Sequence, residues 1–242
     1  MKFIFLCLFA LVSIYTSGQN KPLKIKITHL TDNIYVCTSY GILDDGSVYP
    51  ANGLYIVTAT GVIMIDTPWG QPQTLQLLDT LRSRYHKPVV YCISTHFHAD
   101  RTGGVDILKQ RGIKTYSTLL TKQLAAKNGD KQPEFPFRND TTFKTGGEVV
   151  DVYYPGAGHT QDNIVVWLPQ HRVLFGGCFI KSFDSGDIGN IADANLKAWP
   201  GSIENVRTRF KGIKYVIPGH EGWQGDTSQF GHTLKLIKQA GY

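Results

Sequence analysis

Apolar residues recur along the chain at two spacings, and each spacing predicts a different kind of element. Short apolar or alternating runs bounded by turn residues are typical of strands, whereas apolar residues three and four positions apart are typical of a helix with one buried face. The strand pattern covers residues 25–28, 34–38, 54–59, 62–66, 89–93, 114–116, 148–154, 163–168, 172–175 and 214–217. The helical pattern covers residues 72–85, 104–110, 119–127, 202–210 and 230–240.

The order of these elements repeats. Each half of the chain begins with hairpin strands, continues with a helix and reaches a strand that ends on a histidine, His96 in the first half and His220 in the second. No Pro-rich or Ser-rich linker separates the two halves. The repetition predicts an internally duplicated α/β sandwich, in which two sheets pack face to face and helices cover the outside.

The first 18 residues depart from this pattern. Lys2 precedes an apolar run over residues 3–15, and the small residues Ser17 and Gly18 follow it. These are the features of a secretory signal peptide, because a transmembrane helix needs about 20 apolar residues. We therefore expect residues 1–18 to be removed. The mature chain, 19–242, would be a single domain without a membrane anchor, exported to the periplasm of a double-membraned bacterium.

Composition and charge narrow the classes of function. Hydrophobic residues make up 42% and charged residues 18% of the chain, which is typical of an ordinary globular core. Removal of Lys2 lowers the formal net charge from +6 to +5. The basic residues are spread along the chain without a cluster, so a nucleic-acid partner is not indicated. A mild positive charge suits an anionic small-molecule substrate, and we expect the protein to act as a monomer.

Cysteine use agrees with export. Three cysteines survive the predicted cleavage, an odd number that cannot form a complete disulfide framework. Cys37 and Cys92 lie within apolar strands and are predicted to be small buried hydrophobic residues. Cys178 instead follows Gly176-Gly177 at a strand end, where ligands bind in layered α/β folds. A thiol stays free more easily in an oxidising compartment when a metal holds it as a thiolate.

The candidate chemistry centres on residues 95–104, T-H-F-H-A-D-R-T-G-G. His96, His98 and Asp100 alternate directly after an apolar strand. Alternation places both imidazoles on one side of an extended segment, and the carboxylate can reach the same region once the chain turns at the two glycines. Imidazole and carboxylate together form a zinc ligand set. The alternative is a polar loop in which Asp100 caps the helix at 104–110 and both histidines are exposed.

Three further candidate ligands stand at strand ends: His159 in G-A-G-H-T-Q-D-N, Cys178, and His220 in P-G-H-E. Each is ambiguous alone, since a histidine at a strand end is more often a satisfied polar residue. Six candidates together fit two zinc ions better than one, because a structural zinc closes at four ligands and a catalytic zinc keeps about three ligands plus water. The remaining histidines lack this context and are predicted not to bind metal: His29, His86, His171 and His232.

The motifs H-F-H-A-D-R, G-H-T-Q-D-N, G-G-C-F-I-K, G-N-I-A-D-A-N and P-G-H occur in this order over nearly the whole mature chain. In this combination the chain resembles the class B metallo-β-lactamases, specifically the subclass with a His-His-His and an Asp-Cys-His zinc site. The resemblance implies a four-layer αββα sandwich that binds two zinc ions. The implied ligands are His96, His98 and His159 for one ion, and Asp100, Cys178 and His220 for the other.

The resemblance also implies a function, the zinc-dependent hydrolysis of the β-lactam amide of penicillins, cephalosporins and carbapenems, which would confer antibiotic resistance. A three-histidine zinc lowers the pKa of bound water to about 7 and so provides zinc-bound hydroxide at neutral pH. Asp100 would orient this nucleophile, and Asn190 would donate to the developing oxyanion. Lys181 would pair with the substrate carboxylate. From the residues alone, Asn190 could equally be a turn residue and Lys181 an exposed loop lysine.

Supporting residues are also expected around the site. Asp66 and Arg101 are predicted to fix the ligand geometry, although Asp66 could instead cap the helix that follows Pro68. Trp69 could form an apolar wall or belong to the core. Residues 41–50 match the family's mobile flap, with the polar tip Leu43-Asp44-Asp45-Gly46.

Two rival functions follow from the same residues. Other hydrolases of the superfamily, such as glyoxalase-type thioesterases and lactonases, continue the H-x-H-x-D motif as Asp-His and use a bridging Asp. Here Arg101 and Cys178 stand in those places. The second rival is a non-catalytic zinc-binding protein of the periplasm. Open coordination positions on the metal would distinguish an enzyme from that protein.

Overall fold

Two β-sheets form the framework of the computed structural model, which describes residues 23–138 and 140–242. The predicted signal peptide lies outside these residues. The first sheet has the order β1 (Lys26–Thr31), β2 (Ile34–Ile42), β3 (Val48–Val57), β4 (Val62–Ile65), β5 (Val89–Ile93), β6 (Lys114–Thr118), β7 (Phe135–Phe137). The second has the order β12 (Tyr215–Pro218), β11 (Val173–Gly177), β10 (Val165–Leu168), β9 (Glu148–Tyr153), β8 (Thr141–Thr145).

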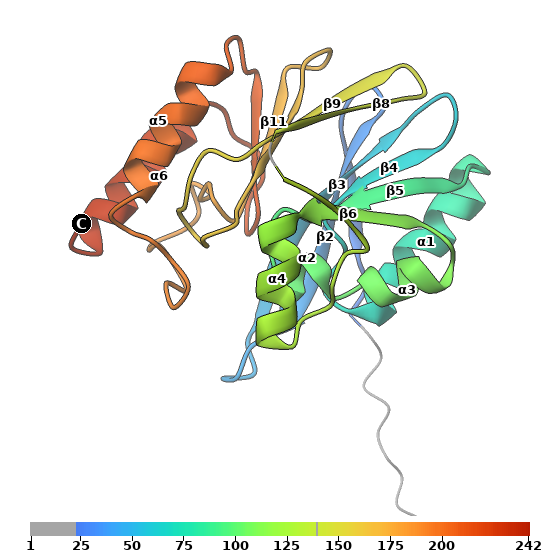
Figure 1. The fold of residues 1–242 in the computed structure, drawn as a ribbon, viewed down its shortest axis with the longest axis horizontal. Coiled ribbons are helices and arrows are strands. Elements are labelled where there is room, and N and C mark those ends of the chain that lie inside the picture. The colour runs from blue at the N-terminus through green and yellow to red at the C-terminus, as the bar shows by residue number, and fades with distance from the viewer. Residues whose placement is uncertain (1–22, 139) are drawn as a thin grey trace, which may run out of the picture.

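Each sheet has helices on its outer face (Figure 1). One group follows the strands of the first half: α1 (Gln71–Tyr85), α2 (Ala99–Thr102), α3 (Val105–Gln110) and α4 (Leu119–Asn128). The other consists of α5 (Trp199–Arg209) and α6 (Ser228–Gln239). The parallel pairs β4/β5 and β11/β12 are each joined through a helix, as parallel neighbours require.

Three apolar clusters hold the layers together. One lies between the sheets and joins residues such as Ile56 and Ile93 to Val166 and Phe175. A second packs α1 and α3 on the first sheet, and a third packs α5 and α6 on the second sheet around the fully buried Trp199. The order of layers is therefore helix, sheet, sheet, helix. This αββα sandwich is the fold class that the sequence predicted.

The main differences from the predicted elements concern strands that carry polar or proline residues. β3 begins at Val48, six residues before the predicted strand, and includes Pro50. Proline is tolerated there because β3 pairs with β4 only over Leu54–Val57, which leaves the edge near Pro50 without a β4 partner. β7 and β8 were not predicted, since F-P-F contains a proline and T-T-F-K-T carries only one apolar residue.

The predicted state of two cysteines is confirmed. Cys37 and Cys92 are buried and free, and both belong to the cluster under α1. Burial raises the pKa of Cys37 to about 12 and that of Cys92 well above its usual value. Both thiols therefore stay protonated and unreactive at neutral pH.

None of the helices within residues 23–138 and 140–242 combines the length and the apolar character that a membrane crossing requires.

Candidate metal centre

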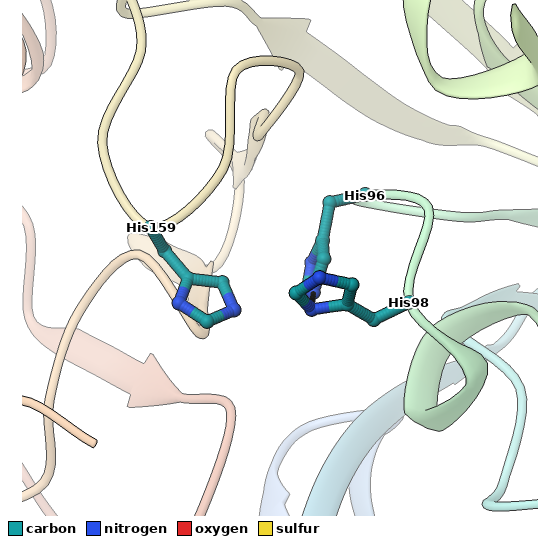
Figure 2. A group of neighbouring side chains, drawn as sticks. All are labelled: His96, His98 and His159. Atoms are coloured by element: carbon teal, nitrogen blue, oxygen red, sulfur yellow. Dashed lines mark hydrogen bonds between the residues drawn. The ribbon is translucent and has the colours of Figure 1, made fainter. Parts of the chain in front are cut away.

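Three histidines converge at one end of the sandwich. His96 and His98 follow β5, and His159 lies in the loop between β9 and β10. Nε2 of His96 lies 3.1 Å from Nδ1 of His98, and one ring nitrogen from each of the three histidines lies within 4.8 Å of the other two. The His159 ring faces the other two rings from the opposite side (Figure 2).

The other three predicted ligands form a second group beside the first. Sγ of Cys178 lies 3.5 Å from Oδ2 of Asp100 and 3.1 Å from Nε2 of His220. The same carboxylate oxygen lies 3.2 Å from Nε2 of His220. His96 borders both groups, because its ligand atom and those of Asp100 and Cys178 lie within 4.8 Å of one another. The fold thus brings all six predicted ligands into two adjoining groups.

The backbone near His96 turns earlier than the alternating pattern predicts. Residues 95–98 form a bend and do not extend β5, and α2 begins at Ala99. Asp100 therefore reaches the second group from the first turn of α2, where it is 7% exposed. The N-cap of α3 is Gly104. The alternative of an exposed loop with Asp100 as a helix cap is therefore wrong.

Close packing between two loops brings Cys178 beside His220. These residues follow β11 and β12, which are parallel neighbours. A Cβ atom at Gly219 would lie 2.5 Å from the backbone nitrogen of Cys178 and 2.7 Å from its Sγ, so only glycine permits this approach. Nδ1 of His220 lies 2.7 Å from the carbonyl oxygen of Pro50. Donation of the Nδ1 proton to this oxygen leaves Nε2 as the lone-pair donor toward Asp100 and Cys178.

A fully buried arginine holds the second group in place. Nε of Arg101 lies 2.8 Å from Oδ2 of Asp100. Its Nη2 donates to Sγ of Cys178 at 3.0 Å and to the carbonyl oxygen of Gly219 at 2.7 Å. Its Nη1 donates to the carbonyl oxygen of Asn52 at 2.6 Å. These contacts support the predicted role of Arg101 in fixing ligand geometry.

Asp66 positions the segment that carries His96. Its Oδ1 accepts the backbone N–H of Thr95 at 2.7 Å and its Oδ2 accepts the Thr95 hydroxyl at 2.8 Å. Burial raises the pKa of Asp66 to about 7, against the opposing influence of Arg101 and Thr95. The alternative that Asp66 caps the next helix is wrong, because the N-cap of α1 is Gly70.

Asp193 lies at the site, but no role was predicted for it from the sequence. Its Oδ2 lies 2.9 Å from Nε2 of His98. A histidine that binds metal commonly donates its second ring N–H to a carboxylate, which fixes the tautomer and the ring orientation. Asp193 lies within the motif G-N-I-A-D-A-N, whose match to the family was the available signal.

Asn52 was missed as well, because Asn52-Gly53 resembles a turn and not the middle of a strand. Its Nδ2 donates to the carbonyl oxygens of Pro218 and Glu221 at 3.2 and 3.0 Å. Its Oδ1 accepts the hydroxyl of Thr38 at 2.9 Å. Asn52 therefore ties the first sheet to the loop that carries His220.

Burial and neighbouring charges set the protonation of the ligands. Burial lowers the pKa of His96 and His159 well below the usual histidine value, and it also lowers that of His220. Burial alone would raise the pKa of Asp100, but Arg101 and His220 hold it well below its usual range. At neutral pH the rings of His96, His159 and His220 are therefore neutral and the Asp100 carboxylate is charged, which are the forms that bind metal.

The two groups fit zinc. Zinc–ligand bonds of about 2.0 to 2.3 Å at tetrahedral angles set two ligand atoms roughly 3.3 to 3.6 Å apart, close to the 3.1 to 3.5 Å within the second group. Burial raises the pKa of Cys178 although Arg101 opposes this. A coordinating metal deprotonates such a thiol, and a set of imidazole, thiolate and carboxylate suits zinc.

A cavity of about 560 Å³ opens onto both groups. Trp69 and Leu43, the latter at the flap tip, give it an apolar side. Trp69 packs so closely on Gly41 that a Cβ atom there would lie 2.5 Å from the indole ring. Trp69 is half-buried and lines the cavity. It therefore fits the predicted apolar wall and not the core.

Lys181 and Asn190 line the polar side of this cavity. Lys181 is only 9% exposed, so the alternative of an exposed loop lysine is wrong. Burial lowers the pKa of its ammonium group, although nearby anionic groups oppose this. Asn190 borders this cavity, and its Oδ1 accepts the backbone N–H of Ala192 at 3.0 Å in a turn.

The four histidines predicted not to bind metal make other contacts. Nε2 of His29 lies 2.8 Å from the carbonyl oxygen of Asp32, and Nε2 of His232 lies 3.1 Å from that of Ser185. His86 is the C-cap of α1, and His171 lies between two carboxylates. The two possible metal-binding groups found in the described part of the chain contain none of them.

Comparison with known proteins identifies the family. Residues 46–238 match the model of the metallo-beta-lactamase superfamily. A metallo-beta-lactamase type 2 from Elizabethkingia meningoseptica is 41% identical over 239 residues, which cover 99% of this chain and 95% of that protein. One from Bacillus cereus is 44% identical over 220 residues, which cover 91% and 85%. The solved structure of a metallo-beta-lactamase from Pontibacter korlensis has a TM-score of 0.85 at 40% identity and covers 88% of this chain and 99% of that one. The chain therefore belongs to the metallo-β-lactamase superfamily.

Proposed function

We propose that this protein is a zinc-dependent β-lactamase that hydrolyses the ring amide of penicillins, cephalosporins and carbapenems and so protects its host from them. The observation that carries the proposal is the convergence of the six candidate metal ligands in two adjoining groups, four of whose members line one cavity. The cavity also presents a buried lysine, as recognition of the carboxylate of a β-lactam requires. The family and the names of the similar proteins support the same activity.

The proposed ligand sets follow the two groups. His96, His98 and His159 would hold one zinc ion. Asp100, Cys178 and His220 would hold a second ion, supported by their mutual distances of 3.1 to 3.5 Å. When bound, zinc lowers the pKa of a coordinated water and polarises a carbonyl, which supplies a nucleophile and an electrophile at neutral pH.

The side chains of this protein would position the reactants around that chemistry. Lys181, a compact positive charge in a buried position, would bind the substrate carboxylate and fix the ring in the cavity. Asn190 would use its amide nitrogen as a donor to the carbonyl oxygen where negative charge develops. Asp100, held in its charged form by Arg101, would accept a hydrogen bond from the nucleophile and orient it. Trp69 would exclude water from one side of the ring.

Location and assembly complete the proposal. Residues 1–18 would direct export and be removed, and residues 19–242 would act as a single-domain monomer in the periplasm. β-Lactams act on targets outside the cytoplasm, so an enzyme there would meet them first. N-terminal sequencing of exported protein tests this step. A start near Gln19 supports it, and an intact Met1 would contradict it.

Hydrolysis assays test the proposed activity. Purified protein should open a penicillin, a cephalosporin and a carbapenem, and a chelator should abolish the activity. A thioester and a lactone serve as control substrates, because the rival hydrolases of the superfamily would prefer them. Rapid thioester or lactone hydrolysis without β-lactam hydrolysis would overturn the proposal, and absence of any hydrolysis by the zinc-loaded protein would favour a non-catalytic zinc protein.

A further inference from the structure

A second, smaller cavity of about 200 Å³ adjoins the metal cavity. The two cavities share Tyr49, Lys181, Asp187 and Gly189. The smaller one is completed by the loop at 185–186 and by Glu221, the residue after the candidate ligand His220. A substrate held at Lys181 therefore has room to extend past the lysine, away from the metal-binding groups.

Two carboxylates line this second cavity, and the fold holds both in place. The Ser185 hydroxyl donates to Oε2 of Glu221, and the carbonyl oxygen of Glu221 accepts Nδ2 of Asn52 at 3.0 Å. Oδ1 of Asp187 accepts the backbone N–H of Gly189 at 2.8 Å. Neither carboxylate takes part in any ion pair found among residues 23–138 and 140–242. Both carboxylates therefore lack a direct ion-pair partner in this part of the chain, although they act on the nearby Lys181 ammonium over a longer distance.

Lys181 gives independent evidence for a ligand at the junction of the two cavities. Its side chain is 91% buried, corresponding to 9% exposure. Its ammonium group makes no hydrogen bond or ion pair within the described residues, and its recorded contact is the ring of Trp199 at 5.6 Å. Glu221 and Asp187 act on this charge only from beyond ion-pair distance, and a buried charge without a direct partner is costly. An anion from the substrate would provide that partner.

The covalent structure of β-lactams then determines what enters the second cavity. In cephalosporins and carbapenems the carbon next to the one that bears the carboxylate carries a variable substituent, whereas in penicillins the corresponding carbon carries only two methyl groups. With the carboxylate at Lys181, that substituent would extend into the second cavity.

We infer that Glu221 and Asp187 form an acidic subsite that favours β-lactams whose substituent beside the carboxylate is positively charged. The inference rests on the proposed β-lactamase function and adds a substrate preference to it. A cationic group in the cavity would be attracted by both carboxylates, whose combined charge exceeds the opposing charge of Lys181. An anionic substituent would be repelled by the same groups.

The test uses two cephalosporins that share one acylamino side chain and differ only beside the carboxylate, one with a pyridiniummethyl group and the other with a neutral acetoxymethyl group. The measured quantity is the ratio of kcat/KM for the cationic substrate to that for the neutral one. Glu221→Gln and Asp187→Asn keep the shape of the cavity and remove one charge each. Each should lower the ratio about two- to fivefold, the range of a partly exposed charge pair, and the double variant should lower it further.

Asp79→Asn is the matched control. Asp79 lies on α1 with its side chain 72% exposed, so its substitution removes the same charge at a position away from the cavity. Its ratio should equal that of the unaltered enzyme. An unchanged ratio in both cavity variants would overturn the acidic subsite while leaving the β-lactamase function intact. Failure of the unaltered enzyme to hydrolyse either substrate would overturn the proposed function and the subsite together.

Discussion

A cluster of polar side chains lies at each end of β11. The two clusters differ in the partners that their side chains have. Before β11, the two ring nitrogens of His171 lie 2.8 Å from Oδ2 of Asp32 and 2.9 Å from Oε2 of Glu148. After β11, Sγ of Cys178, Oδ2 of Asp100 and Nε2 of His220 lie within 3.5 Å of one another, and Arg101 contacts all three residues. At the His171 end each ring nitrogen faces one carboxylate, whereas at the Cys178 end three atoms of the kinds that bind metal converge on one another. A cluster that contains histidines and carboxylates therefore predicts a metal site only when its metal-binding atoms face one another, as they do at Cys178.

Burial also separates the two ends. Arg101, which neutralises the carboxylates of the metal end, is fully buried, and Asp100 is 7% exposed. At the other end the side chains of His171 and Glu148 are 11% and 12% exposed, but that of Asp32 is 64% exposed, and no side chain there is fully buried. Charges in water are screened and contribute little, while a buried charge that loses its partner is strongly destabilising. The contrast therefore predicts large effects at the Cys178 end and small effects at the His171 end.

The largest effect is expected for Arg101→Met. The change leaves Asp100 and Asp66 buried near each other without their cation and removes the donor to Cys178. We expect the free energy of unfolding to fall by about 3 to 5 kcal/mol, measured by urea denaturation at fixed zinc concentration. Arg209→Met is the control, because the Arg209 side chain is 50% exposed and pairs with Asp140 at 3.4 Å. Equal losses in the two variants would contradict the comparison.

Within the metal end, Cys178→Ser and Lys181→Ala should separate chemistry from binding. A serine hydroxyl is a poor zinc ligand, so Cys178→Ser should lower kcat by at least the 10- to 100-fold that loss of an outer partner of a metal ligand costs. Lys181→Ala should mainly raise KM. The rise should correspond to a loss of about 1 to 3 kcal/mol of substrate-binding free energy, as for a charged hydrogen bond. Unchanged kinetics of Lys181→Ala on carboxylate-bearing substrates would show that its assignment is wrong.

Asp193→Asn tests whether the carboxylate beside His98 acts as a partner of a metal ligand. An amide can occupy the same space but cannot stabilise the donating imidazole as strongly, so zinc affinity should fall about 10- to 100-fold. Competition against a chromophoric chelator measures this affinity without reference to hydrolysis. Asp79→Asn provides the control for loss of one charge. If Asp193→Asn binds zinc as tightly as the unaltered protein, the 2.9 Å contact has no such role.

The smallest effect is expected for His171→Gln, and it should depend on pH. Burial would lower the pKa of His171, but Asp32 and Glu148 raise it more, so the net shift is upward. A raised histidine pKa stabilises the folded state fully below the unfolded value of about 6.5, and this stabilisation is lost as pH rises through the folded pKa. The variant should therefore lower the melting temperature at pH 6 and not at pH 9. The loss in the free energy of unfolding at pH 6 should be about 1 kcal/mol or less. A larger loss at pH 9 would contradict the sign.

Much of the site could be predicted because its ligands follow apolar strands. The runs before His96, Cys178 and His220 are continuous and apolar, and the structure places all three residues just after β5, β11 and β12. Parallel pairing between β11 and β12 then brings two of them together at one edge. The layer order was also predictable, since the helices carry apolar residues on one face and the three clusters use those residues.

The remaining features depend on contacts between distant parts of the chain. The bend at 95–98 has no local signal that distinguishes it from an extended segment, and it decides how Asp100 reaches the metal groups. Asp193 lies in an irregular loop, and its role follows only from its distance to His98. β7, which contains a proline, and β8, which carries only one apolar residue, lie at the sheet edges, where they pair with β6 and β9.

The most direct test of the central claim, that the metal end is catalytic and not structural, is to strip the metal and follow structure and activity together. The three apolar clusters exist without the ligands, so the fold should persist. We predict that a chelator abolishes β-lactam hydrolysis while far-UV circular dichroism stays nearly native, that the melting temperature falls through lost metal binding, and that activity returns at about two zinc ions per chain. Collapse of the dichroism on chelation, or full activity in the metal-free protein, would contradict the account.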